Sequence, residues 1–437
     1  MKKLLNIQKR IKQNDFLKNL VTNSFWAFCG DSISSVINLL ITIILIKMIS
    51  DNGYGTLVVA QSYMLVMDVL LNIQSWKSVI RYGQQAITSN NEDDLYGYVK
   101  LGCILDISTA ILGGILSYLF ATIIGGILNW NSELILCAEL FSFTIFSHFS
   151  GTPTAILRLL NKFNLVAAQK IISALVKLGA FIYLLFFQSN ISLIFSVIVY
   201  VITDILGNLI LIIFSIYVFS KKYSLKRLLK SSFPTKKNEF IKYTLWGTFS
   251  DILDIPVNYF DVFILSFLST QLVAVLKVFK QIISILSKVT TPIYQAILPQ
   301  FSELSALGKE KYGFNIVLKI QKAILLIMGP ISLIIGFSSP LWLKYIYGEL
   351  YAQYWIVLLL FLAVQTLALS YTTVHPFFIS IGKAKESSYI VLISNLIYIV
   401  VSILLIQKIG MMALVISYFL QSSIVIGLKI LCIKKEL

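Results

Sequence analysis

Long apolar stretches separated by short polar segments dominate the sequence from residue 20 to residue 433. The stretches reach the roughly 20 residues that an α-helix needs to cross the ~30 Å hydrocarbon core of a bilayer. Charged residues make up 13% of the chain, against about 25% in soluble domains. The pattern predicts an all-α polytopic membrane protein, and it excludes a soluble enzyme, a disordered chain and a disulfide-stapled secreted domain.

Twelve transmembrane spans can be placed on this pattern. Their predicted ranges are 20–48, 55–80, 99–125, 133–157, 163–187, 191–219, 241–268, 271–298, 315–339, 352–381, 386–407 and 410–433. We expect a basic tail over 1–19, a six-helix lobe over 20–219, a basic linker over 220–240 and a second six-helix lobe over 241–437. The linker, with seven Lys or Arg, is expected to lie against anionic lipid headgroups rather than to dock a partner.

The distribution of basic residues predicts the orientation. The N-terminal tail, the loops after even-numbered spans and the C-terminal tail, with the adjoining span ends, hold 27 of the 36 Lys and Arg. The opposite side holds Lys47, Lys344 and Lys408, and six lie inside spans. Because cytoplasmic loops carry such an excess, both termini are expected in the cytoplasm. The net charge of +16 is then a feature of topology, and no nucleic-acid partner is expected.

The two halves of the chain repeat each other at an offset of 220 residues. The offset pairs Trp26 with Trp246, Asp31 with Asp251, Asn38 with Asn258 and Gln61 with Gln281. Matches of Trp, Asp and Asn are rare by chance in so apolar a chain. They predict two bundles in parallel orientation, and such repeats occur in transporters that place a substrate site between their halves.

Charged side chains at span depth are the candidate functional groups, because each costs a few kcal/mol in lipid and must face a cavity or a partner. The lysines predicted to line a lumen and attract an anionic headgroup are Lys77, Lys177, Lys277, Lys280 and Lys288. The carboxylates predicted to couple ions or to form structural pairs are Asp31, Asp251, Asp254 and Asp261. Buried ion pairs that hold the helices in register are the alternative interpretation.

Spans 7 and 8 are expected to form an antiparallel hairpin that turns near Ser269 and Thr270. Equal depth then places Asp261 level with Lys277 and Lys280, and Asp251 level with Lys288. Two ion pairs between these helices are therefore predicted, Asp261 with a span-8 lysine and Asp251 with Lys288.

Catalytic and metal-binding motifs are not recognisable in the sequence. The four cysteines fall in apolar segments without metal-ligand spacing, and His148 and His375 stand alone. We therefore expect no enzymatic activity, no metal and no cofactor.

Several segments resemble Wzx-type polysaccharide flippases of the multidrug/oligosaccharidyl-lipid/polysaccharide exporter superfamily. They are 53–83, 275–309, 340–363 and 377–400, the third containing the turn YIYGELY and the fourth the loop ISIGKAK. Each motif is loose, but together they cover nearly the whole chain. The resemblance implies a twelve-helix fold with a cationic lumen between two lobes.

What the resemblance implies about function is a flippase in the bacterial cytoplasmic (inner) membrane. Its expected substrate is an undecaprenyl-pyrophosphate-linked oligosaccharide for O-antigen, capsule or exopolysaccharide synthesis, moved by alternating access coupled to H⁺ or Na⁺. A polymerase and a chain-length regulator are expected pathway partners. The alternatives are a drug/cation antiporter of the same superfamily and, disfavoured by the short outside loops, a membrane-embedded polysaccharide polymerase.

Overall fold

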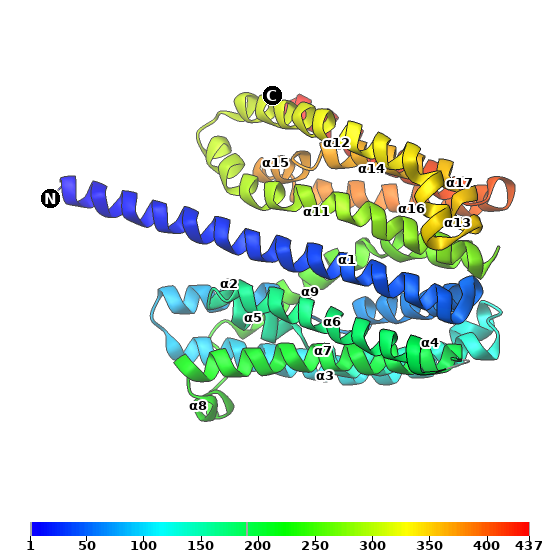
Figure 1. Cartoon of the computed structure of the whole chain (residues 1–437). Coiled ribbons are helices and arrows are strands. Elements are labelled where there is room, and N and C mark those ends of the chain that lie inside the picture. Colours follow the sequence, from blue (N-terminus) through cyan, green and yellow to red (C-terminus); the bar gives the residue numbers. More distant parts are fainter. Residues whose placement is uncertain (1, 189–190, 437) are drawn as a thin grey trace.

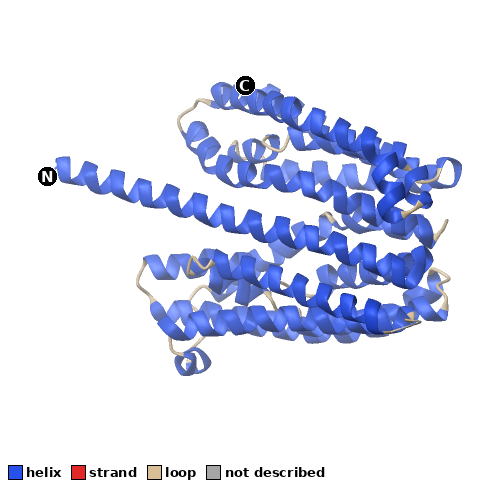
Figure 2. Ribbon diagram, viewed as in Figure 1, coloured by secondary structure: helices blue, strands red, loops and turns tan. Residues whose placement is uncertain are grey.

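The structure is a computed structural model that describes residues 2–188 and 191–436. Side chains are described from residue 22 onward, except at 289, 291–296, 298–299, 302–303, 306 and 384. The described residues form helices and loops alone (Figure 2). The helices are α1 (Lys2–Leu71), α2 (Trp76–Thr88), α3 (Glu92–Ile127), α4 (Ser132–Ser147), α5 (Gly151–Leu159), α6 (Phe163–Phe187), α7 (Leu193–Lys222), α8 (Leu225–Lys230), α9 (Lys237–Leu253), η1 (Pro256–Phe260), α10 (Asp261–Ser266), α11 (Thr270–Ala306), α12 (Glu310–Tyr347), α13 (Glu349–Gln353), α14 (Trp355–Ser370), α15 (Val374–Ser380), α16 (Ala384–Ile409) and α17 (Met412–Glu436).

The helices form two bundles, and α1 runs between them (Figure 1). Helices α2–α7 lie on one side and α10–α17 on the other, which confirms the all-α, two-bundle fold class. We call the end of the bundles that carries residues 88–92, 159–163 and 222–237 the terminal end, because the N-terminus extends from it. The opposite end, with residues 127–132, 266–270 and 347–355, is the distal end. The ribbons of the two lobes converge toward the distal end (Figure 1).

Ten helices among the described residues are long and apolar enough to cross a membrane. One of them, Thr22–Leu71, contains two of the expected spans. A break in the helical backbone at Ser50, where φ is 64° and ψ is 169°, separates the two spans. The seventh expected span is divided into α9, η1 and α10, none of which is by itself long enough to be one of the ten. Together these elements account for the twelve expected crossings.

Several predicted boundaries need correction. The second span was expected to be continuous over 55–80, but its helix ends at Leu71 and restarts as α2 at Trp76. The fourth and tenth spans likewise break, between α4 and α5 and between α14 and α15. Helix α1 begins at Lys2, so the expected basic tail is a helical extension of the first span.

Buried polar side chains stabilise the breaks in the second and fourth spans. Asp106 on α3 accepts hydrogen bonds from the backbone N–H of Ser75 (2.8 Å) and from the backbone N–H (2.5 Å) and hydroxyl (2.7 Å) of Thr152. A second contact joins the carboxylate of Asp68 to Nδ1 of His148 at 2.6 Å. A carboxylate that accepts several hydrogen bonds replaces those lost where a helix ends inside a membrane.

The basic linker docks on the N-terminal lobe at the terminal end. Lys100 donates to the carbonyls of Leu229 (2.9 Å) and Ser231 (2.7 Å), and Arg227 pairs with Glu92 (2.7 Å) and Asp93 (3.0 Å). The hydrogen bond to Asp93 raises the pKa of the Arg227 guanidinium.

Helix α9 packs on the N-terminal lobe although the sequence places it in the second half. The hydroxyls of Thr244 and Ser78 lie 2.6 Å apart, and Phe240 stacks on Tyr98 with 5.6 Å between ring centroids. The chain then returns to the C-terminal lobe through the π-helix that begins at Pro256, where proline removes a helical hydrogen bond. The expected domain boundary at 240/241 stays a prediction.

Candidate functional site

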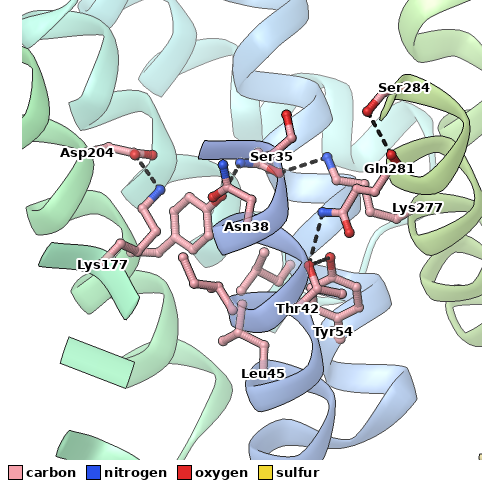
Figure 3. A pocket seen from close by; sticks show the side chains of 14 residues that line it. Ser35, Asn38, Thr42, Leu45, Tyr54, Lys177, Asp204, Lys277, Gln281 and Ser284 are labelled. Atoms are coloured by element: carbon pink, nitrogen blue, oxygen red, sulfur yellow. Dashed lines mark hydrogen bonds and ion pairs between the residues drawn. The ribbon is translucent and has the colours of Figure 1, made fainter. Parts of the chain in front are cut away.

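A polar cavity of about 310 Å³ lies between the two lobes. Helices α1, α6 and α7 line one side and α11 lines the other. Its lining residues are Ser35, Asn38, Ile41, Thr42, Leu45, Tyr54, Leu57, Gln61, Lys177, Tyr200, Asp204, Lys277, Gln281 and Ser284. Figure 3 shows Lys177 and Asp204 on one side of α1 and Lys277 and Gln281 on the other. We call this space the central cavity.

The lysine on the N-terminal side of the central cavity is neutralised. Nζ of Lys177 lies 2.5 Å from a carboxylate oxygen of Asp204 on α7. The same ammonium group lies 3.6 Å from the ring centroid of Tyr200, which adds a cation–π contact. With 8% of its side chain exposed, Lys177 is held by this pair and has little capacity left for a ligand.

The lysine on the C-terminal side is different. Nζ of Lys277 donates a 3.3 Å hydrogen bond to Oε1 of Gln61, and it makes no ion pair with any side chain that the structure describes. Gln61 is in turn oriented by its own 2.9 Å hydrogen bond to the hydroxyl of Tyr200. A lysine without a carboxylate partner in a polar cavity is a group that an anion can bind.

A second glutamine extends the polar lining toward the distal end. Nε2 of Gln281 donates to Oγ1 of Thr42 at 3.0 Å, and Thr42 lies 3.1 Å from the hydroxyl of Tyr54. Oε1 of Gln281 is buried and has no hydrogen-bond partner among the described atoms. Since an unsatisfied buried carbonyl costs free energy, this oxygen is a group that a hydroxyl-bearing ligand can satisfy.

Contacts between the lobes close the cavity at the distal end. The hydroxyl of Thr270 donates to Oδ1 of Asn52, and the hydroxyl of Tyr351 donates to Oδ1 of Asp51 at 2.9 Å. Gly55 lies against the backbone of Thr270 so closely that a Cβ built on Gly55 would stand 2.5 Å from the carbonyl carbon of Thr270. These contacts, between the start of the second span and two segments of the other lobe, form the distal seal.

A smaller cavity of about 250 Å³ lies inside the C-terminal lobe, and two of the predicted residues are in it. Lys280 pairs there with Asp261 at 2.7 Å and donates to the carbonyl of Asn258 at 2.7 Å. The predicted pair between Asp261 and a span-8 lysine is thus confirmed, as is the turn between α10 and α11 near Ser269 and Thr270. Lys280 belongs to this side cavity and not to the central one.

The second predicted ion pair is wrong. Asp251 pairs with Lys77 on α2 at 2.7 Å, not with Lys288. The prediction assumed a straight seventh span, whereas the break between α9 and α10 lets α9 pack on the N-terminal lobe and carries Asp251 with it. Lys288 lies on α11 and lines neither the central cavity nor the side cavity.

The remaining predicted carboxylates lie outside the central cavity. Asp31 on α1 pairs with Lys170 on α6 at 2.5 Å. Asp254 is exposed at the end of α9. Of the predicted site residues, the structure therefore brings Lys177 and Lys277 together around the central cavity. Among the described residues, no group of His, Cys, Asp or Glu is arranged to hold a metal ion.

Sequence reasoning missed most polar residues of the central cavity, among them Gln61, Tyr200, Asp204 and Gln281. A signal for the two glutamines was present, because Gln61 and Gln281 are repeat partners at the offset of 220. Transporters built from such repeats place their substrate sites at the interface between the halves, so matched polar residues are candidates for that interface. Asp204 carries the signal that identified the other candidates, because it is a charged side chain inside an apolar span.

The fold is that of membrane transporters of the MOP superfamily. A transporter of this superfamily from Pyrococcus furiosus, described as having a binding pocket of reversed polarity, superposes with a TM-score of 0.69 and 14% identity over 95% of this chain and 96% of its own. A multidrug-resistance MATE family transporter in an inward-facing conformation superposes with a TM-score of 0.67 and 12% identity, over 95% of this chain and 94% of its own. At these identities the likeness establishes the fold alone.

The family is shown by the sequence. The chain belongs to the polysaccharide biosynthesis protein family, whose model matches residues 20–305, and the expected relation to Wzx-type proteins is confirmed. The inner membrane protein YghQ of Escherichia coli (strain K12) is 31% identical over 156 residues, which is 35% of this chain and 43% of that protein. The aligned part thus spans less than half of the curated relative. Family and fold together indicate a multi-helix membrane protein with the architecture of MOP transporters.

Proposed function

We propose that the protein translocates a lipid-linked oligosaccharide across the bacterial inner membrane, with a pyrophosphate headgroup bound in the central cavity. Undecaprenyl pyrophosphate is the proposed carrier, and O-antigen, capsule or exopolysaccharide synthesis the proposed pathway. Membership of the polysaccharide biosynthesis family supports the substrate class, and the MOP fold supports transport between two lobes.

The observation that carries the proposal is the unpaired charge of Lys277. The titratable residues lining the central cavity are two lysines, one aspartate and two tyrosines, and the aspartate is bound to Lys177. One positive charge remains, beside the amide of Gln61 and the unsatisfied carbonyl of Gln281. A diphosphate can bind the ammonium group of Lys277, and sugar hydroxyls can donate to the side-chain carbonyl of Gln281. The lining therefore suits a glycosyl diphosphate.

The distal seal supports transport by alternating access. The contacts of Asn52, Asp51 and Gly55 with the C-terminal lobe close the central cavity at the distal end. We place the terminal end in the cytoplasm, because most Lys and Arg gather there. The structure is then a state closed toward the outside, and export requires the distal seal to open. An H⁺ or Na⁺ gradient as driving force and a polymerase and chain-length regulator as partners belong to the same proposal.

The test compares three single variants in cells that depend on this protein for surface polysaccharide. Lys277→Gln should reduce surface polysaccharide at least about tenfold, because removing one charge-assisted hydrogen bond weakens binding by about 1.5–3 kcal/mol. Lys277→Arg keeps the charge and should retain much of the activity. Lys288→Gln is the matched control, since it removes a lysine from the same helix outside the central cavity.

Protein abundance in the membrane is measured alongside, by immunoblot. Equal polysaccharide from wild type and Lys277→Gln at equal abundance would contradict the proposal. So would an equal loss in Lys277→Gln and Lys288→Gln, because that result would trace the effect to charge in α11 rather than to the central cavity.

Drug/cation antiport is the second candidate, and the shared fold with MATE transporters favours it. A cationic drug needs a cavity with a free carboxylate or an aromatic cage, whereas the carboxylate of the central cavity is bound to Lys177. Export of a fluorescent cationic dye that survives in Lys277→Gln while surface polysaccharide is unaffected would support this candidate over the flippase.

A further inference from the structure

A third cavity, of about 560 Å³, opens at the terminal end of the N-terminal lobe. It is lined by the C-terminal end of α2, the turn between α5 and α6, and the last turns of α7. None of its lining residues lines the central cavity. This cavity is therefore distinct from the one proposed to bind the transported substrate.

Positive charge is concentrated in this cavity. Lys162, Lys221 and Lys222 line it, and no Asp or Glu does. None of the three forms an ion pair with a carboxylate that the structure describes, and the ammonium of Lys221 lies 4.2 Å from the ring centroid of Tyr217. We call this cavity the lysine pocket.

The carboxylates of the acidic loop 92–94 at the same end already have partners. Arg227 is held by Glu92 and Asp93, and Asp94 accepts hydrogen bonds from the backbone N–H and the hydroxyl of Thr235. The nearby acidic loop is thus used to dock the linker. The three lysines of the pocket are left to an external anion.

The rest of the lining indicates which anion. Apolar side chains from all three elements share the wall with the lysines, namely Ile87, Leu159, Leu160, Leu165 and Val218. Side-chain amides come from Gln84, Asn161 and Asn164. A free phosphate ion needs the cations and amides but has no use for an apolar wall. A phospholipid needs both, because its phosphate continues into a glycerol and two acyl chains.

We propose that the lysine pocket binds the phosphate headgroup of an anionic phospholipid of the cytoplasmic leaflet. Basic pockets at the cytoplasmic ends of transmembrane helices are suited to such headgroups. The three lysines meet the phosphate, the amides donate to its ester oxygens, and the apolar wall receives the upper acyl chain. The bound lipid joins α2, the α5–α6 turn and α7, so it stabilises the N-terminal lobe. This proposal does not rest on the transported substrate.

The experiment measures thermal unfolding of the purified full-length protein in a neutral detergent. Phosphatidylglycerol, phosphatidylethanolamine and inorganic phosphate are added separately at equal concentrations. A ligand that binds the folded state raises the unfolding temperature. Phosphatidylglycerol should raise it in a saturable manner, whereas the zwitterionic lipid and inorganic phosphate should not.

The variant that tests the site is Lys162→Gln/Lys221→Gln/Lys222→Gln. At about fivefold per lysine near a membrane surface, the apparent affinity for phosphatidylglycerol should fall on the order of 100-fold. The matched control is Lys226→Gln/Lys230→Gln/Lys311→Gln, which removes the same charge from exposed positions outside the pocket and should respond like wild type.

A charge-preserving variant protects the test against misfolding. If the glutamine variant does not fold, Lys162→Arg/Lys221→Arg/Lys222→Arg is measured instead, with the lipid response retained as the expected result. An unchanged response in the folded glutamine variant would overturn the proposal, as would loss of the response in the arginine variant. A full shift produced by inorganic phosphate would also overturn it, by showing a site for soluble phosphate.

Discussion

Gly55 is the position where one methyl group should change the balance between the closed and open states of the distal end. It lies in the helical part of α1 beyond the break at Ser50, in contact with the backbone of Thr270 in the other lobe. In Gly55→Ala the new Cβ would stand 2.5 Å from the carbonyl carbon and 3.2 Å from the Cα of Thr270, and nearer still to its oxygen. Backbone atoms cannot turn aside as a side chain can, so the lobes must separate.

The magnitude follows from comparing the two states. Alanine is favoured over glycine inside a helix by about 1 kcal/mol, but this gain is the same whether the distal end is closed or open and so cancels. The clash exists only in the closed state, and forcing an extra methyl into a packed contact costs about 1–3 kcal/mol. The ratio of open to closed molecules should therefore rise about 5- to 150-fold.

The assay is the rate at which a thiol in the central cavity reacts with a membrane-impermeant maleimide added outside the cell. Ser284, which lines the central cavity, is replaced by cysteine in a background where the four native cysteines are replaced by serine or alanine. Gly55→Ala should raise the labelling rate, and Gly55→Val should raise it further.

The matched control is Gly53→Ala. A Cβ at Gly53 would meet the side chain of Ile49 in the same lobe-connecting helix α1, at 3.2 Å, and not the C-terminal lobe. The added methyl group should therefore act alike on both states. The labelling rate of Gly53→Ala should match that of the parent. If Gly55→Ala and Gly55→Val, present at normal abundance, label no faster than Gly53→Ala, the distal contact does not restrain opening and the reasoning fails.

Three further predictions concern stability and topology. Asp261→Asn should lower the free energy of unfolding by about 3–5 kcal/mol, because it leaves Lys280 charged and without its carboxylate partner, whose side chain is 6% exposed. Lys77→Gln should lower it by less than about 1 kcal/mol, because the side chains of Lys77 and Asp251 are 33% and 51% exposed. Thermal unfolding of the two variants measures the difference. Asp106→Asn should lower the unfolding temperature through a loss of about 1–3 kcal/mol, because an amide NH₂ would face N–H donors, with Asp106→Ala expected to be no less damaging. Reporter fusions at residues 130 and 345 should report the outside and fusions at residues 90 and 309 the cytoplasm; the reverse pattern would invert the assigned orientation.

Membrane crossings and local pairing were determined by the sequence. A run of apolar residues longer than the bilayer core has one stable arrangement in lipid, a spanning helix that satisfies its own backbone, so all twelve crossings could be predicted. The pair between Asp261 and Lys280 could be predicted as well, because both residues flank one short turn. In each case the determining interaction lies within a few turns of helix.

Breaks inside the spans depended on tertiary contacts. Polar residues stand at the break of the second span, and Gly151 and Pro153 follow the break of the fourth. They indicate an interruption but not its position, and the helices end where Asp106 supplies acceptors from a third helix. The seventh span contains Pro256, which indicates a kink but not its direction. Docking of the linker and Phe240 on the N-terminal lobe supplies that direction, and it gives Asp251 the partner Lys77 instead of Lys288.

Which lysine is available to a ligand was decided by the tertiary structure alone. Lys177, Lys277 and Lys280 are equivalent in the sequence, as lysines inside apolar spans. Asp204 neutralises the first and Asp261 the third, and Lys277 is left with Gln61. Hydrophobic periodicity places a helix in the membrane but does not determine its rotation against a distant neighbour. The net charge of a cavity is the sum of the charges that side chains from both lobes contribute. It is therefore determined only once the helices have packed together.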